Sequence, residues 1–439
     1  MKTSYVKLSA PTNIQWELSP WCNHNCIYCY NYWRVGADPK LNVTSEQRLL
    51  HDTAAQEIIN SGVFDVTITG GEPLGVIQWF TEPIEKLKNA GIVLSINSNL
   101  TLLTPDLANL LKRLGIYSVL TSIQSSDPNI NDELAQRRGA QKRTLEGIKL
   151  AIEYGLRVSV NMVVTKKNLH TVRDTGKLAK EIGASTFCAT KAATPFNCPD
   201  FSEYELTNSE LSQMLFDLIW VNKNYGIRIE TLEHYPSCVF PDDETMTILG
   251  SRSCSAGKTG CTIGFDGQIR PCSHAHVTYG NVTDGLKSAW DKMDEWRNVS
   301  LVPEFCKDSC NAFPFGCEGG CRIAAYVSCG SISASDPYCV NKPPIAKRLS
   351  KQYEPIPENA TLKLTKNAKF RLEKFGYIAY GGSHNWAPID EKLYDLLINH
   401  GKNGGFRVRD LLNIYDVPES SAISTAQLLI SKRIVKIVN

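Results

Sequence analysis

The sequence predicts an α/β fold in which six strand–helix units form a partial, laterally open barrel. Over the first 225 residues, apolar runs of strand length alternate with amphipathic stretches of helix length. A helix after every strand is typical of a parallel sheet, because the chain must cross back before it forms the next strand. A closed barrel of this type needs eight units. Six units therefore indicate a barrel that stays open on one side.

The expected strands are short and apolar, and they span residues 13–19, 64–70, 93–99, 117–123, 157–164 and 185–190. Helical periodicity lies near residues 47–61, 77–90, 106–114, 142–154, 169–182 and 207–224. Thr44, Thr104 and Thr144 stand where helices are expected to begin, since a threonine hydroxyl can accept a hydrogen bond from the first turn. Glycines follow the helices, as expected for residues that end a helix in the left-handed conformation.

The composition is that of an ordinary globular protein, with 42% hydrophobic residues, 21% charged residues and a formal net charge of +2. This balance gives no reason to expect nucleic acid or a membrane surface as a partner. No apolar run approaches the roughly 20 residues of a membrane span, and the N-terminus lacks the apolar stretch of a signal peptide. We therefore expect a soluble, cytoplasmic protein.

The chain contains 15 cysteines, which is many for such a protein. Disulfides are rare in a reducing cytosol, where numerous cysteines indicate metal ligands instead. Three cysteines lie at residues 22, 26 and 29, and nine lie between residues 254 and 339. This uneven distribution favours two metal-binding regions over disulfides spread along the chain.

The sequence pattern divides the chain into three domains. Residues 1–235 carry the barrel pattern, whereas Gly, Pro, Ser and Cys dominate residues 236–350, which cannot easily form an apolar core and need another source of stability. A proline-rich linker precedes residues 360–439, where regular structure returns. Strands are expected at 362–364 and 377–380, helices at 389–400, 407–415 and 422–432, and a strand at the end. That order resembles a winged helix.

A cysteine-rich loop follows the first expected strand. Cys22, Cys26 and Cys29 have the spacing C-x-x-x-C-x-x-C. Three thiolates on one loop can bind three irons of a 4Fe-4S cluster and leave the fourth iron open. A structural zinc ion normally needs four protein ligands, and a chance cluster of cysteines is the third interpretation. The loop stands at a strand end, where a barrel of this kind places its active site.

This loop resembles the signature of the radical S-adenosylmethionine (SAM) superfamily, and further matches follow at the ends of successive strands. The resemblance implies that SAM is contacted by Tyr28, Gly70, Gly71, Glu72, Ser98, Asn99, Ser122 and Arg138. In this likeness Glu72 supplies a carboxylate for the amino group of SAM, and Tyr28 lies near the adenine. Leu100 replaces the glycine that the family has after Asn99, and Gln124 stands where many relatives carry an aspartate.

The resemblance also implies an activity. One electron from the cluster would split SAM and give a 5′-deoxyadenosyl radical that abstracts a hydrogen atom from the substrate. The cofactor carries this chemistry, and the protein supplies placement and excludes water. No catalytic acid or base can be named from the sequence.

The later cysteines resemble the SPASM extension of this family, which holds two auxiliary 4Fe-4S clusters. The resemblance assigns Cys254, Cys261, Cys272 and Cys321 to the first auxiliary cluster, and Cys306, Cys310, Cys317 and Cys339 to the second. Three 4Fe-4S clusters and SAM are then the expected cofactors. Two structural zinc sites are the alternative. Cys188, Cys198, Cys238 and Cys329 are left over and are expected to be small buried hydrophobic residues, with Cys188 kept as a weak site candidate.

The C-terminal domain resembles the recognition element of enzymes that modify ribosomal peptides. In that module a leader peptide adds as a strand to an exposed sheet edge, where backbone hydrogen bonds give affinity. Residues 361–439 carry 12 Lys or Arg and 7 Asp or Glu residues, so DNA binding by a winged helix is the alternative.

These observations together predict a radical SAM enzyme that modifies a ribosomally made precursor peptide, held by its leader. The expected product is an intramolecular crosslink through a carbon–carbon, ether or thioether bond, and the expected partner is a low-potential electron donor of the flavodoxin or ferredoxin type. An enzyme that makes formylglycine in sulfatases is the alternative within the same class. A zinc-organised binding protein with a winged-helix module is the alternative from another class.

Overall fold

The computed structural model describes residues 5–34, 43–196, 200–313, 317–347, 349, 355–357, 360–382, 385–402, 404–415 and 418–438. Its scaffold is a nine-stranded sheet in the order β7-β6-β5-β4-β3-β2-β1-β8-β9. The strands are β1 (Asn13–Glu17), β2 (Asp65–Thr69), β3 (Val93–Asn97), β4 (Ile116–Ser122), β5 (Arg157–Val164), β6 (Thr186–Lys191), β7 (Arg228–Glu230), β8 (Gly260–Ile263) and β9 (Ile269–Arg270). Strands β1 to β7 are parallel and follow chain order, which confirms the predicted parallel α/β sheet. The three-residue strand β7 was not predicted.

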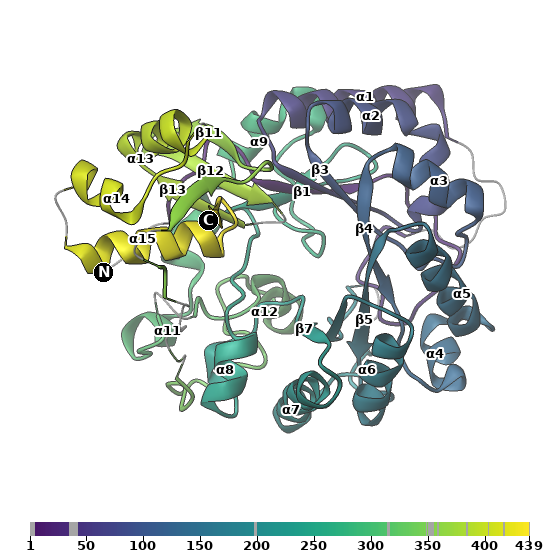
Figure 1. The fold of residues 1–439 in the computed structure, drawn as a ribbon. Coiled ribbons are helices and arrows are strands. Elements are labelled where there is room, and N and C mark those ends of the chain that lie inside the picture. The colour runs from purple at the N-terminus through teal and green to yellow at the C-terminus, as the bar shows by residue number, and fades with distance from the viewer. Residues whose placement is uncertain are drawn as a thin grey trace.

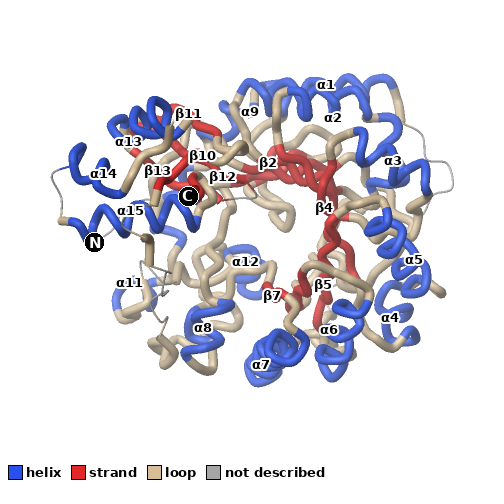
Figure 2. The backbone as a smooth tube through the Cα atoms, viewed as in Figure 1, coloured by secondary structure: helices blue, strands red, loops and turns tan. Residues whose placement is uncertain are grey.

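Helices cover the outer side of the curved sheet, which bends from β2 through β4 to β5 and β7 (Figures 1 and 2). They are α1 (Ser45–Asn60), α2 (Thr81–Asn89), α3 (Pro105–Arg113), α4 (Pro128–Ala135), α5 (Ala140–Glu153), α6 (Val172–Glu181) and α7 (Asn208–Tyr225). Thr44 and Thr104 cap α1 and α3 as predicted. Thr144 lies inside α5 instead, because the helix begins at Ala140. The Thr144 hydroxyl donates to the carbonyl of Asn99 at 3.0 Å and ties α5 to the end of β3.

The cysteine-rich region continues the barrel sheet, because β8 pairs with β1 in parallel and β9 pairs with β8. Its helices are short: α8 (Asp243–Leu249), α9 (Leu286–Asp291), α10 (Asp294–Arg297), α11 (Glu304–Asp308) and α12 (Arg322–Cys329). Trp290 is fully buried and its indole N–H donates to the carbonyl of Leu8 at 2.8 Å. Among the described residues no helix has the length and apolar character that crossing a membrane requires.

The C-terminal residues form a small α+β unit with its own apolar core around Leu362, Phe406 and Leu411. Its elements are β10 (Thr361–Leu364), β11 (Lys369–Glu373), β12 (Gly376–Gly382), β13 (Asn385–Ile389), α13 (Glu391–Leu396), α14 (Val408–Tyr415), α15 (Glu419–Ser431) and β14 (Val435–Val438). Strands β11, β12 and β13 form an antiparallel sheet, and β10 pairs with β14. Strands β11 and β13 were not predicted, and the helix expected from residue 389 begins at Glu391.

The C-terminal unit contacts the barrel at the amino-terminal ends of its strands. The rings of Tyr380 and Phe64 are stacked with centroids 4.7 Å apart. The Arg371 guanidinium donates to the carbonyls of Ala10 at 2.7 Å and Pro11 at 2.8 Å. These segments precede β1 and β2, so this contact lies at the end of the barrel opposite the predicted SAM site.

Candidate functional site

The loop after β1 brings Cys22, Cys26 and Cys29 together. Burial, the Glu72 carboxylate and the charges of Cys26 and Cys29 raise the pKa of Cys22 well above its usual range. The backbone N–H of His24 donates to the Cys22 sulfur at 3.4 Å. Three thiols grouped on one loop are suited to a cationic metal centre, because metal binding removes their protons. The residues therefore fit the cluster that the spacing predicts.

A glycine-rich segment after β2 lies directly along this cysteine loop. The N–H of Gly71 donates to the carbonyl of Ser19 at 2.8 Å, and the N–H of Glu72 donates to that of Trp21 at 2.7 Å. A Cβ atom on Gly71 would lie 1.9 Å from the Trp21 oxygen, and Gly70 has a φ of +134°. Glycine is therefore required here for the approach of the cysteine-loop backbone, besides any approach of a ligand.

The Glu72 carboxylate connects the ends of β2 and β3. It is 1% exposed and accepts hydrogen bonds from the Ser98 hydroxyl at 2.7 Å, the Asn99 N–H at 2.8 Å and the Leu74 N–H at 2.9 Å. Burial raises the pKa of Glu72, while these hydrogen bonds lower it. Glu72 thus holds Ser98 and Asn99, two further predicted SAM contacts, in fixed positions.

The segment after β3 is also fixed to the cysteine loop. The Asn99 amide donates to the Asn23 side-chain oxygen at 2.8 Å. Leu100 adopts a φ of +59°, in the left-handed region that favours glycine. Its N–H donates to the Ser98 hydroxyl at 3.0 Å, and its side chain is buried. The backbone shape that glycine would give is therefore kept here with a leucine.

The remaining predicted SAM contacts are less closely grouped. The Tyr28 hydroxyl is hydrogen-bonded to the Cys26 thiol, and Ser122 ends β4 beside Asn161 of β5. Arg138 is exposed in the turn between α4 and α5, where its carbonyl accepts from the Arg143 guanidinium at 2.9 Å. The structure thus places Tyr28 and Ser122 at the carboxyl ends of the strands and Arg138 at the surface.

Three of the four cysteines predicted for the first auxiliary cluster lie together. Burial and the Glu233 carboxylate raise the pKa of Cys321, and the charges of Cys254 and Cys272 raise it further. The Cys321 sulfur caps α12 and accepts from the N–H of Ala324 at 3.5 Å. A thiolate at a helix N-terminus is favoured by the dipole of the helix.

Cys261, which the resemblance assigns to the same cluster, lies in a strand, and none of these three thiols contributes to its pKa shift. It lies in β8 opposite Ile14 of β1 and is 3% exposed. Burial raises its pKa to about 12, and the charge that opposes this shift belongs to Arg297 rather than to a metal-site thiol. Because strand residues alternate between faces, β8 directs Cys261 into the apolar core. The first auxiliary site therefore has three grouped cysteines.

The four cysteines predicted for the second auxiliary cluster do lie together. The Cys306 thiol is hydrogen-bonded to Cys339 and interacts with the charges of Cys317 and Cys310. Two residues that the sequence pattern did not assign also lie here. The Cys238 sulfur is 3.7 Å from the Cys339 sulfur, and the backbone N–H of Ser237 donates to the Cys317 sulfur at 3.4 Å. Cys198, also left over, lies outside the described residues.

The spacing of these thiols argues against the two zinc sites that remained an alternative. Among the described residues, no group of three or more His, Cys, Asp or Glu side chains can hold a single metal ion. A zinc ion needs four sulfurs about 2.3 Å from one centre. A 4Fe-4S cluster takes one thiolate on each iron, so its ligands are farther apart. Because no three of these side chains can hold one ion, the grouped cysteines fit clusters better than single zinc ions.

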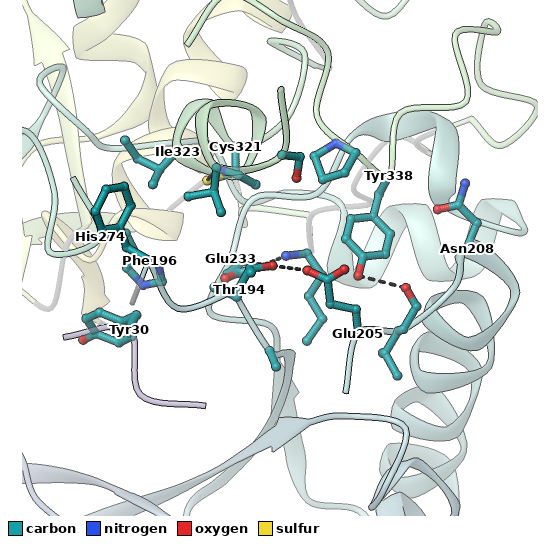
Figure 3. Close-up of a pocket in the computed structure, with 18 of the residues that line it drawn as sticks. Tyr30, Thr194, Phe196, Glu205, Asn208, Glu233, His274, Cys321, Ile323 and Tyr338 are labelled. Carbon is teal, nitrogen blue, oxygen red and sulfur yellow. Dashed lines mark hydrogen bonds and ion pairs between the residues drawn. The ribbon is translucent and has the colours of Figure 1, made fainter. Parts of the chain in front are cut away.

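A cavity of about 320 Å³ lies between the two cysteine regions (Figure 3). Tyr30, next to Cys29 in the sequence, and Cys321 both line it. The Tyr30 ring stacks on His274 with centroids 3.9 Å apart, so the loop after Cys29 contacts the loop after Cys272. Burial lowers the pKa of His274, which keeps the ring neutral at pH 7.

Buried charges lie at the end of the cavity formed by β6 and β7. The Lys191 ammonium is 2.9 Å from the Glu233 carboxylate, and its side chain is 4% exposed. Burial lowers the pKa of Lys191, but the charges of Glu233, Tyr338, Asp336 and Tyr235 together outweigh burial and hold the pKa well above its usual value. Glu205 also lines the cavity and accepts from the Thr194 hydroxyl. The sequence analysis missed these residues, although a lysine that ends an apolar strand was a usable signal.

A second buried ion pair positions the Cys272 loop. Glu17 ends β1 and pairs with Arg270 of β9, and both side chains are almost inaccessible to solvent. The Arg270 guanidinium also donates to the carbonyls of Ser273 at 3.2 Å and Ala275 at 3.3 Å. The pair therefore fixes the loop that carries Cys272 against the strand that precedes Cys22.

Comparison with known proteins agrees with this geometry. Residues 16–179 match the Radical SAM superfamily. The chain is 27% identical over 353 residues to the AdoMet-dependent heme synthase of Methanosarcina barkeri, which covers 76% of this chain and 98% of the relative. It is 26% identical over 349 residues to the mycofactocin maturase MftC of Mycobacterium tuberculosis, which covers 76% of this chain and 84% of the relative.

A similar fold occurs in Streptococcus suis SuiB, whose crystal structure contains the precursor peptide SuiA. The two structures superpose with a TM-score of 0.58 over 76% of each chain, at 17% sequence identity. The radical SAM match and the SuiB likeness agree with the predicted fold class. The radical SAM match favours an enzyme over a zinc-organised binding protein as the interpretation of this chain.

Proposed function

Since residues 16–179 make the chain a radical SAM enzyme, we propose that it modifies a ribosomally synthesised precursor peptide. The bond that forms is an intramolecular crosslink between two residues of the peptide. The observation that carries this proposal is the cavity of about 320 Å³ between the Cys29 loop and Cys321. A cavity of this size is at the lower end for small-molecule sites and suits one or two amino-acid side chains.

The named relatives support a peptide substrate. MftC is a maturase and SuiB was crystallised with a precursor peptide. The heme synthase of M. barkeri is covered over 98% of its length by 76% of this chain, so about a quarter of this chain has no counterpart in it. An added unit is expected where the substrate is a peptide with a leader.

At one end of the cavity, residues of this chain would hold the cofactors that generate the radical, and at the other end they would hold the auxiliary clusters. Cys22, Cys26 and Cys29 would hold a 4Fe-4S cluster, and the segments at Gly70–Glu72 and Ser98–Asn99 would hold SAM. When bound, this pair supplies the radical that removes a hydrogen atom from the substrate. Closure of the crosslink then releases a second hydrogen as a proton and one electron.

The auxiliary cysteines lie on the side of the cavity where that electron must leave. Cys321 lines the cavity itself, and the Tyr30–His274 stack connects the two cysteine regions. We assign two auxiliary clusters to these cysteines, with three cysteine ligands in the first and four in the second. Besides SAM and the precursor peptide, the proposed enzyme needs a low-potential electron donor.

The C-terminal sheet of β11, β12 and β13 would hold the leader by strand addition. Its docking at the amino-terminal ends of the barrel strands sets a length requirement on the peptide. Strand β4 has seven residues and spans about 23 Å. The modified residues must therefore lie at least about seven extended residues from the segment bound to the sheet.

The experiment is anaerobic reconstitution followed by reaction with SAM, a reductant and a candidate precursor peptide. Three clusters predict about 12 iron and 12 sulfide per chain. We expect 5′-deoxyadenosine and a peptide that has lost two hydrogen atoms, and neither product from the Cys22→Ala/Cys26→Ala/Cys29→Ala variant. A porphyrin is the matched alternative substrate, because the heme synthase is the other kind of relative. Turnover of the porphyrin without turnover of any peptide would overturn the proposal, and formylglycine in the product would select the sulfatase-type alternative.

A further inference from the structure

The second auxiliary site contains five thiols, one more than a 4Fe-4S cluster needs. Cys306, Cys310, Cys317 and Cys339 have the spacing that predicts ligands, whereas Cys238 comes from a distant part of the chain. Its sulfur is nevertheless 3.7 Å from the Cys339 sulfur. Since each iron of the cluster takes one thiolate, one of the five thiols is always without an iron.

The turn that carries Cys238 is built against this site. The backbone N–H groups of Ser237 and Gly319 each donate to the Cys317 sulfur at 3.4 Å. Nδ1 of His234, four residues before Cys238, lies 2.7 Å from the carbonyl oxygen of Arg252. Cys238 is therefore not a core residue that happens to lie nearby, because its own turn supplies a donor to a cluster ligand.

The neighbours of each thiol show which ligand Cys238 can replace. Cys339 contacts both Cys238 and Cys306. Cys238 interacts with Cys339 and Cys317, and Cys306 interacts with these two and also with Cys310. The Cys238 and Cys339 sulfurs are 3.7 Å apart, so either of them can reach the same iron.

We propose that Cys238 is an alternative ligand that exchanges with Cys339 on one iron of the second auxiliary cluster. The inference rests on the cluster assigned under the proposed function. In the exchange one iron–sulfur bond breaks and one forms, while a proton passes from the incoming thiol to the outgoing one. Neither sulfur is oxidised or reduced, and the charge of the site is unchanged.

The two ligands differ in how firmly the chain holds them. Cys238 lies in a short turn between the buried residues Ser237 and Val239. Cys339 lies in a loop between the buried Tyr338 and the exposed Val340, and its N–H donates to the carbonyl of Asp336 at 2.8 Å. Exchange would let residues 339–341 leave the site while the cluster keeps four thiolates.

The first test counts iron and sulfide in reconstituted full-length Cys339→Ala, Cys238→Ala and the double variant. We expect both single variants to keep the wild-type iron content, and the double variant to lose about four irons. Cys329→Ala is the matched control, because Cys329, which the sequence predicts to be buried, is an exposed cysteine at the end of α12. A Cys339→Ala variant that loses as much iron as the double variant would overturn the proposal. So would a Cys238→Ala variant that loses four irons on its own, since Cys238 would then be a permanent ligand.

A second measurement avoids variants that fail to fold. The wild-type holoenzyme is alkylated briefly with iodoacetamide, and the labelled cysteines are mapped by mass spectrometry. Exchange predicts partial labelling of both Cys238 and Cys339, adding up to about one label per chain. Full labelling of Cys238 with none on Cys339 contradicts exchange. A wild-type protein with about four irons in total would instead contradict the auxiliary clusters of the proposed function, and this is seen before any Cys238 variant is made.

Discussion

The barrel and the cysteine-rich region are stabilised by different interactions. In the barrel, β2 and β3 bury Val66, Ile68, Leu94 and Ile96 under full-length helices. In the cysteine-rich region the helices have four to eight residues, and buried arginines act beside the apolar packing. Arg322 alone donates to the carbonyls of Leu301 and Ala334, each at 2.8 Å. Where regular structure cannot satisfy the backbone, side chains and metal ligands must do so.

Among the changes that test this comparison, removal of iron is expected to have the largest effect on stability. We expect chelation of iron from the reconstituted protein to open residues 250–347 to protease, because the grouped cysteines of that region would lose the metal that holds them together. The barrel should stay resistant, since its burial does not depend on the clusters. Limited proteolysis with mass spectrometry of the fragments measures both regions at once.

The matched control for iron removal is the Cys22→Ala/Cys26→Ala/Cys29→Ala variant. It should lose only the SAM-binding cluster and leave residues 250–347 as resistant as in the wild type. Equal resistance of both regions after complete iron removal would show that the cysteine-rich region is stable without its metals.

The second prediction concerns the contact between the C-terminal unit and the barrel. Arg371 pairs with Glu373 at 2.8 Å, and the Glu373 side chain is 1% exposed. Substitution Arg371→Met leaves that carboxylate buried without its cation, so we expect the free energy of unfolding to fall by about 4 kcal/mol. Urea denaturation measures this loss. Lys374→Met, an exposed change in the same hairpin, is the control.

The double variant Arg371→Met/Glu373→Met separates charge from packing. It contains no unpaired buried charge, so it should be more stable than Arg371→Met alone. A double variant that is less stable than the single one would show that packing of the arginine stem, rather than the ion pair, holds the C-terminal unit.

The contact between the C-terminal unit and the barrel also shows why strands β11 and β13 could not be predicted from the sequence. The six barrel strands bury apolar side chains, and the sequence pattern finds them. Strand β11 does the reverse: Arg371 and Glu373 face the barrel, while Leu372 is exposed. Its pattern therefore looks like a surface loop until the barrel is present. Strand β13 contains Pro388, which argues against a strand in any local analysis.

The site was predictable where ligands are close in sequence. The spacing of Cys22, Cys26 and Cys29 is sufficient, because one loop holds all three. Spacing could not find Cys238, which reaches the second auxiliary site only through tertiary structure, and it did not show that Cys261 lies in a buried strand. Lys191 and Glu233 meet for the same reason, since parallel strands bring distant residues to one edge.

Substitution of Leu100, whose backbone is strained beside the predicted SAM site, is expected to have a smaller effect on stability. Leu100 has a φ of +59° and is 1% exposed. Loss of a buried leucine costs about 2–5 kcal/mol, whereas release from the left-handed conformation returns about 1–2 kcal/mol. We expect Leu100→Gly to lower the free energy of unfolding by about 2 kcal/mol, and Leu100→Ala to lower it by about 1 kcal/mol more. A glycine variant less stable than the alanine variant would mean that the leucine carries no backbone strain.

The smallest predicted effect appears only on acidification, and it belongs to the apolar barrel. His51 is buried between the rings of Trp16 and Phe80, with centroids 5.3 and 4.4 Å away, and burial lowers its pKa to about 4. The unfolded chain protonates this ring near pH 6.5 while the folded protein keeps it neutral, so stability falls as the pH drops from 6.5 towards 4. About 2 kcal/mol should be lost between pH 7 and pH 5. Substitution His51→Phe should remove that part of the slope, whereas substitution of the exposed His170 should leave it. If the free energy of unfolding of His51→Phe depended on pH as in the wild type, the barrel core would accommodate a charged ring. The interiors of the barrel and of the cysteine-rich region would then differ less than burial indicates.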